Sequence, residues 1–208
     1  MNEKNFEYMF VRMLNPHIGA AFLPPEVEAY AELPYRDSVF KDILDSFNEK
    51  PINVFQVGAI ESLETEYRIG SGWSELFWGE YIKKNGGQLH ICDIDMNHIA
   101  HSNFAASNLK YHVNFYINDA AACLSDLFHD PHVPPFDIYY LDGADEPLGN
   151  QQTLDQFKII EKHKALVLVD DVPTKGQLLL EYLDDHSIVK HYDVGNGMMT
   201  IDLREVNA

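Results

Sequence analysis

The chain has 208 residues, of which 15 are Lys or Arg and 33 are Asp or Glu, so its formal charge at pH 7 is −18. This acidic excess argues against a nucleic-acid backbone or an anionic membrane as partner, because both are bound by clustered basic side chains. Hydrophobic residues make up 46% and aromatic residues 12%, which excludes a disordered chain and is enough for one well-filled core.

The first 50 residues differ from the rest of the chain, because four prolines separate short helical patterns there. Apolar spacing predicts one helix over Asp37–Phe47. No motif is found in this segment. We expect residues 1–50 to form a helical cap on the substrate side of a larger domain, with a plain helical extension packed on a sheet as the alternative.

From residue 51 onward, short apolar strands alternate with amphipathic helices. The predicted strands are Ile52–Val57, Gln88–Cys92, Val113–Ile117, Asp137–Leu141, Ala165–Val169, Ile188–Val194 and Met198–Leu203. The helices predicted between them are Ser74–Lys84, Met96–Asn108, Ala120–His129, Gln151–Glu161 and Gly176–Asp185. This order predicts a doubly wound α/β sheet of seven strands, and the Gly-Asn-Gly turn at 195–197 predicts that the last two strands form an antiparallel hairpin.

Ligands of such sheets bind at the carboxyl ends of the strands, so the residues that follow each strand carry the functional information. Gly58 follows the first strand, and Gly72 and Ser74 open the first helix after it. Glycines let the backbone approach a ligand closely, and a helix N-terminus offers free N–H donors. A plain tight turn between strand and helix is the alternative, since the spacing is not that of a dinucleotide fingerprint.

Acids follow the second and third strands. Asp93 is placed to accept hydrogen bonds from both hydroxyls of a ribose, and Asp95 to cap the next helix. Asp119 could accept from an adenine amino group or cap the helix that begins at Ala120.

Three more aspartates, Asp142, Asp170 and Asp171, follow the fourth and fifth strands. They are expected to meet at one edge of the sheet, where their mutual repulsion calls for a cation or a proton. Oxygen ligands without His or Cys favour Mg²⁺ or Ca²⁺ over Zn²⁺. The alternative is that one of the last two acids turns away to cap the next helix, which leaves no metal site.

Taken in order, these segments resemble the motifs of class I S-adenosylmethionine-dependent methyltransferases over residues 52–203. VFQVGAI resembles the first motif, GSGWSELFWGEYI a glycine-rich helix start, HICDID the ribose motif, NDAAACL the adenine-side motif and FDIYYLDGADE the fourth motif. LVLVDDV resembles the segment that supplies two metal ligands in catechol-type and sugar O-methyltransferases. The resemblance implies a Rossmann-like methyltransferase domain over residues 51–208.

The resemblance also implies roles for individual residues. The positions it assigns to the cofactor S-adenosylmethionine are Gln56, Gly58, Gly72, Ser74, Asp93, Ile94, Asp119 and Ala120. It assigns Mg²⁺ or a similar divalent cation to Asp142, Asp170 and Asp171. In the family that ion binds two substrate oxygens, lowers the pKa of the hydroxyl and orients it toward the methyl group.

The sequence departs from the family pattern at two positions. Gln56 stands where the family usually has Glu or Asp, which weakens the contact to the cofactor's amino group. Asp145 stands where the catechol-type pattern has Lys, so the general base is open. The candidate catalytic residues are Asp142, Asp145 and Lys175.

These observations predict an O-methyltransferase that acts on a small hydroxylated acceptor with a divalent cation. A metal-independent methyltransferase and a non-catalytic binding module are the alternatives. Residues 1–14 lack the apolar centre of a signal peptide, and Ala165–Val169 is far shorter than a membrane span, so we expect a cytoplasmic protein. The expected partner is the small-molecule acceptor, with no nucleic acid and no membrane, and formation of a homodimer is left open.

Overall fold

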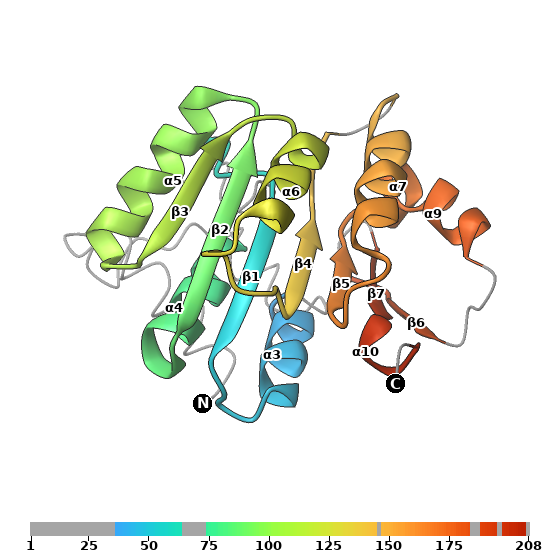
Figure 1. Ribbon diagram of the computed structural model, residues 1–208, viewed down its shortest axis with the longest axis horizontal. Helices are drawn as coiled ribbons and strands as arrows, with labels where there is room; N and C mark the ends of the chain where they lie inside the picture. The colour runs from blue at the N-terminus through green and yellow to red at the C-terminus, as the bar shows by residue number, and fades with distance from the viewer. Residues whose placement is uncertain (1–35, 64–73, 145–146, 184–187, 195–196, 207–208) are drawn as a thin grey trace, which may run out of the picture.

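The computed structural model describes residues 36–63, 74–144, 147–183, 188–194 and 197–206. Its centre is a seven-stranded sheet in the order β3-β2-β1-β4-β5-β7-β6 (Figure 1). The strands are β1 (Ile52–Val57), β2 (Gly87–Asp93), β3 (Val113–Ile117), β4 (Ile138–Leu141), β5 (Leu166–Val169), β6 (Val189–Tyr192) and β7 (Met198–Asp202). The first five are parallel, and β7 pairs antiparallel with both β5 and β6. The predicted α/β sheet with its antiparallel hairpin is confirmed.

Helices cover both faces of this sheet (Figure 1). They are α3 (Arg36–Ser46), α4 (Glu75–Asn85), α5 (Met96–Leu109), α6 (Ala120–His129), α7 (Gly149–Ile160), α8 (Val172–Lys175), α9 (Gln177–Tyr182) and α10 (Leu203–Val206). Apolar side chains of α3, α4 and α5 form the core on one face, and those of α6, α7 and α9 form the core on the other. Within the described residues, none of these helices has the length and apolar character needed to cross a membrane.

Strand β5 shows why the sequence pattern indicated this arrangement. All four of its side chains are buried, as expected for an uninterrupted apolar strand that is covered on both faces. The helix predicted over Asp37–Phe47 is also present, as α3, and its Val39 and Phe40 pack into the core on one face of the sheet. Residues 1–35 lie outside the described part of the chain, so the proposed cap stays a prediction.

The segment after β5 differs from the prediction. A single helix was expected over Gly176–Asp185, but the chain already becomes helical at Val172 and continues as α8 and then α9, with Gly176 between them. Pro173 is favourable in the first turn of α8, because the missing N–H has no partner there in any helix. Lys175 therefore belongs to a helix that starts directly after Asp171. Asp171 and Lys175 are four residues apart, so they lie on the same side of this helical turn.

The order of the strands reverses between β1 and β4, which are direct neighbours in the sheet. In open α/β sheets the crevice for a ligand lies at the carboxyl ends of the strands at this reversal. The loops after β1, β2, β3, β4 and β5 all meet at that edge.

Candidate functional site

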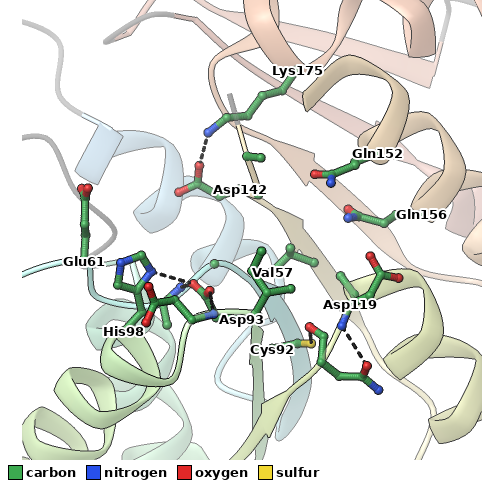
Figure 2. A pocket seen from close by; sticks show the side chains of 18 of the residues that line it. Val57, Glu61, Cys92, Asp93, His98, Asp119, Asp142, Gln152, Gln156 and Lys175 are labelled. Atoms are coloured by element: carbon green, nitrogen blue, oxygen red, sulfur yellow. Dashed lines mark hydrogen bonds and ion pairs between the residues drawn. The ribbon is translucent and has the colours of Figure 1, made fainter. Parts of the chain in front are cut away.

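A cleft of about 440 Å³ lies at the carboxyl edge of the sheet. The loops after the five parallel strands all contribute to it, together with α7 and α8 (Figure 2). Its lining includes the backbone and side chains of Val57, Gly58, Ala59, Glu61, Cys92, Asp93, Ile94, Asp95, His98, Asn118, Asp119, Ala120, Asp142, Gly143, Ala144, Gln152, Gln156, Asp171 and Lys175. The residues that follow the five parallel strands, where a ligand was predicted to bind, therefore line one cleft.

Gly58 forms part of the wall of this cleft and is held in a conformation that suits glycine. Its φ is +89°, and a Cβ built on it would lie 2.2 Å from the carbonyl oxygen of Asp142. Its N–H donates to the carbonyl of Cys92 at 2.9 Å. Any larger residue would separate the ends of β1 and β4, so the glycine is required by the fold.

Asp93 lies at the end of β2, where main-chain donors surround its carboxylate. It accepts hydrogen bonds from the N–H of Ala59 at 3.0 Å and of Asp95 at 2.8 Å. The Nδ1 of His98 lies 3.2 Å from the same carboxylate (Figure 2). The predicted cap is confirmed, because Asp95 Oδ1 accepts from the N–H of Asn97 at the start of α5. The ribose contact of Asp93 stays a prediction.

Asp119 caps α6 through one carboxylate oxygen. Its Oδ1 accepts from the N–H of Ala122 at 3.0 Å, which confirms the cap and leaves Oδ2 for other partners. Both Asp119 and Ala120 line the cleft, as does Ile94, whose side chain is 74% exposed. An apolar side chain left uncovered beside a cleft is suited to pack on a flat ring.

Gln56 and Ser74 were expected to contact the cofactor, but neither is among the described residues that line the cleft. The carboxamide of Gln56 is 1% exposed; it donates to the carbonyl of Gly58 at 2.8 Å and accepts from the hydroxyl of Ser74 at 3.2 Å. Gln56 therefore ties the end of β1 to the residue that precedes α4. Gly72 lies outside the described residues.

The three aspartates after β4 and β5 come together as predicted. Asp142, Asp170 and Asp171 each offer a carboxylate oxygen, and these atoms lie within 4.8 Å of one another. Asp170 is fully buried. The Tyr140 hydroxyl lies 2.8 Å from Asp170 Oδ2 and 3.1 Å from Asp142 Oδ2, so its single proton is shared between the two carboxylates. Asp171 begins α8 with a φ of +48° and makes no capping bond with its side chain.

A lysine lies among these acids. The Nζ of Lys175 is 2.6 Å from Asp142 Oδ1 and 3.2 Å from Asp171 Oδ2, and the lysine side chain is only 5% exposed (Figure 2). Among the described residues, the ammonium of Lys175 thus lies against two of the three carboxylates. The sequence had offered Lys175 as a base, but here its ammonium donates to two acids. Asp145, the other proposed base, lies outside the described residues.

Sequence reasoning missed several polar residues of the lining, among them Glu61, His98, Gln152 and Gln156. Gln152 and Gln156 stand one helical turn apart on α7 and point into the cleft (Figure 2). An available signal was their i,i+4 spacing on the helix after the fourth strand, which places two amides on one face.

Comparisons with known proteins give structural matches only. No protein-family model matches the chain, and no curated protein is similar to it in sequence. The SAH-bound methyltransferase PaMTH1 of Podospora anserina superposes with a TM-score of 0.55 at 14% identity, over 97% of this chain and 96% of that one. A methyltransferase from Geobacter sulfurreducens gives 0.56 at 13% identity, over 96% and 97%. Cofactor-bound Rv0187 from MTB gives 0.56 at 11% identity, over 98% and 91%.

The chain has a methyltransferase fold. Identities of 11 to 14% compare architecture and not chemistry, so these matches confirm the Rossmann-like methyltransferase sheet. The activity has to be argued from the residues of the cleft itself.

Proposed function

We propose that this protein transfers a methyl group from S-adenosylmethionine to an oxygen atom of a small hydroxylated acceptor, such as a sugar or a catechol-like compound. The observation that carries the proposal is the cleft at the strand-order reversal of a methyltransferase fold, with Asp93 and Asp119 on one side and the acids around Asp142 on the other. An acidic cleft also suits a cofactor whose sulfonium is positively charged.

Different described residues are suited to bind different parts of such a cofactor. Asp93 Oδ1 accepts one hydrogen bond within the protein, so it keeps capacity for a ribose hydroxyl. Asp119 Oδ2 is available to the adenine amino group, and Gly58, which lines the cleft, would lie against the methionine part. The acceptor would then lie toward Asp142, and catalysis would consist of aligning its oxygen with the methyl carbon and the sulfur.

The carboxylates of Asp142, Asp170 and Asp171 are the donor set for a divalent cation in this proposal. Three oxygen ligands within 4.8 Å of one another suit Mg²⁺ or Mn²⁺ by chemistry. Such an ion, when bound, would supply positive charge that acidifies the acceptor hydroxyl. It would need the Lys175 ammonium to leave, because that group already contacts two of the three acids.

The position of Lys175 favours a second candidate, a metal-independent transfer. With its ammonium between Asp142 and Asp171, the lysine itself supplies a positive charge at the place where the metal-dependent version needs an ion. In this version the acids orient the lysine and the acceptor rather than an ion.

Calorimetry with S-adenosylhomocysteine tests the main proposal. We expect saturable binding to the wild-type protein, with a methyl group transferred to at least one member of a panel of sugars and catechols. Absence of binding contradicts the proposal. Tight binding without turnover on any acceptor supports the non-catalytic module instead.

Binding of Mn²⁺ distinguishes the two candidates. The free ion is quantified by its electron paramagnetic resonance signal. The metal-dependent version expects one Mn²⁺ per wild-type chain. The lysine version expects no stoichiometric binding to wild type and binding to Lys175→Met, which removes the ammonium from Asp142 and Asp171. Lys164→Met, which removes an exposed lysine after α7, is the matched control and should behave like wild type.

A further inference from the structure

The carboxamide of Gln156 lies in the cleft with unusual surroundings for a buried polar group. Gln156 belongs to α7, and its side chain reaches the cleft on the side of Asp119, across from Asp93 and His98 (Figure 2). The residue is only 4% exposed. Its amide makes no hydrogen bond to any residue in the described part of the chain.

Other buried polar side chains on this part of the molecule are paired. Asn150, one turn and a half earlier in the same helix, accepts from the N–H of Gln177 at 2.7 Å. Gln56 uses its amide to join Gly58 and Ser74. Buried amides in proteins are nearly always hydrogen-bonded. The amide of Gln156 is not among the fully enclosed unpaired atoms of the described residues, so it is open to the cleft and its partner has to come from there. A glutamine whose role was structural would be paired as these two are.

The ligand that would satisfy Gln156 needs both a donor and an acceptor, because a carboxamide has an NH₂ group and a carbonyl oxygen side by side. The edge of adenine offers this combination, with the 6-amino group as donor and the neighbouring ring nitrogen as acceptor, and Gln pairs with it through two hydrogen bonds. Asp119, beside Gln156, can only accept and so also selects an amino group over a carbonyl oxygen.

We infer that Gln156 is the residue that distinguishes adenine in the bound cofactor, by accepting from its 6-amino group and donating to a ring nitrogen. This inference rests on the proposed function, because it takes S-adenosylmethionine as the ligand. Asp93 then holds the ribose on the opposite side of the cleft, and Gln152, one turn earlier on α7, lies next to Gly143 on the way to the Asp142 cluster.

The test compares Gln156→Met with wild type in calorimetric binding of S-adenosylhomocysteine and of its 6-oxo analogue, S-inosylhomocysteine. Methionine keeps the length of the side chain without its hydrogen bonds. Wild type should bind the adenine ligand more tightly than the 6-oxo ligand. The substitution should lower the affinity for the adenine ligand about tenfold or more and the affinity for the 6-oxo ligand much less. The melting temperature of ligand-free Gln156→Met should be close to that of wild type, since the amide makes no hydrogen bond within the described residues that the substitution could break.

The matched control is Gln151→Met on the same helix. Gln151 is exposed, and its amide donates to Asp155 on the helix surface at 2.8 Å, so this variant should bind both ligands like wild type. Equal affinity of wild type and Gln156→Met for S-adenosylhomocysteine overturns the inference. A lower melting temperature with an equal loss for both ligands also overturns it, since that marks a structural role. Failure of wild type to bind S-adenosylhomocysteine contradicts the proposed function itself.

Discussion

The acid at the end of β2 and the acids at the ends of β4 and β5 lie along one edge of the sheet, yet their charges are compensated by different partners. Asp93 is surrounded by main-chain N–H groups, and His98 lies beside it. Asp142 and Asp171 share the ammonium of Lys175, and Asp170 relies on the hydroxyl of Tyr140 and one N–H.

This difference teaches that the two sides of the cleft depend on different properties of the sequence. The Asp93 side is held by backbone geometry, which tolerates changes in neighbouring side chains. The Asp142 side depends on one positive charge from a single residue, so one substitution can remove it. Perturbing the two sides separately should therefore give effects of different size.

The largest effect is expected from Lys175→Met, which leaves Asp142 and Asp171 without the ammonium that they share. Removing one partner of a buried charge pair costs about 3–5 kcal/mol, because the remaining charges are desolvated and unpaired. The free energy of unfolding, measured by urea denaturation in the presence of EDTA, should fall by that amount relative to Lys164→Met. An unchanged unfolding midpoint would show that the lysine does not hold the cluster together.

A smaller effect is expected from Asp93→Ala. The N–H groups of Ala59 and Asp95 lose their acceptor, and each partly buried N–H without a partner destabilises by about 1–3 kcal/mol, with Ala59 the less able to reach water. The free energy of unfolding of the variant should be about 2 kcal/mol lower than that of wild type. Calorimetry should no longer detect binding of S-adenosylhomocysteine. Full binding by a folded Asp93→Ala would remove this acid from the cofactor site.

A third way of burying an acid, by keeping its proton, sharpens the comparison. Glu75 at the start of α4 is 2% exposed, and burial raises its pKa to about 8, against the opposing effect of a 2.6 Å hydrogen bond from Ser102. Between the ordinary pKa of 4.5 and this value, the folded chain holds a proton that the unfolded chain releases. Stability therefore falls as pH rises through this range, by at most about 1.4 kcal/mol per pH unit.

Glu75→Gln removes this pH dependence because the amide is neutral at every pH. Urea denaturation should show that the free energy of unfolding of wild type falls by about 1.4 kcal/mol more than that of the variant between pH 6 and pH 7. Equal losses in the two proteins would mean that Glu75 is ionised in the folded state.

The fold could be predicted because strand–helix alternation depends on local patterns that persist along the chain. The caps by Asp95 and Asp119 could be predicted because Asp is a preferred residue at a helix N-terminus. The three acids after β4 and β5 could be expected to meet because parallel strands end at one edge of the sheet. Lys175 could not be placed, because its position depends on where the helix after β5 begins. Gln156 was not singled out, because its burial depends on how α7 packs in the folded chain, and the local sequence does not show this.

The amide at position 56 constrains how this chain could change by mutation. Gln56 donates to the Gly58 carbonyl, and a carboxylate in the same place has no proton to give and would face that oxygen with like charge. Replacing Gln56 with the acid that the methyltransferase motif usually carries would therefore disturb the turn at Gly58 unless the turn changed as well. The single substitution Gln56→Glu is therefore expected to destabilise the end of β1, and a second change at the turn would be needed to restore it.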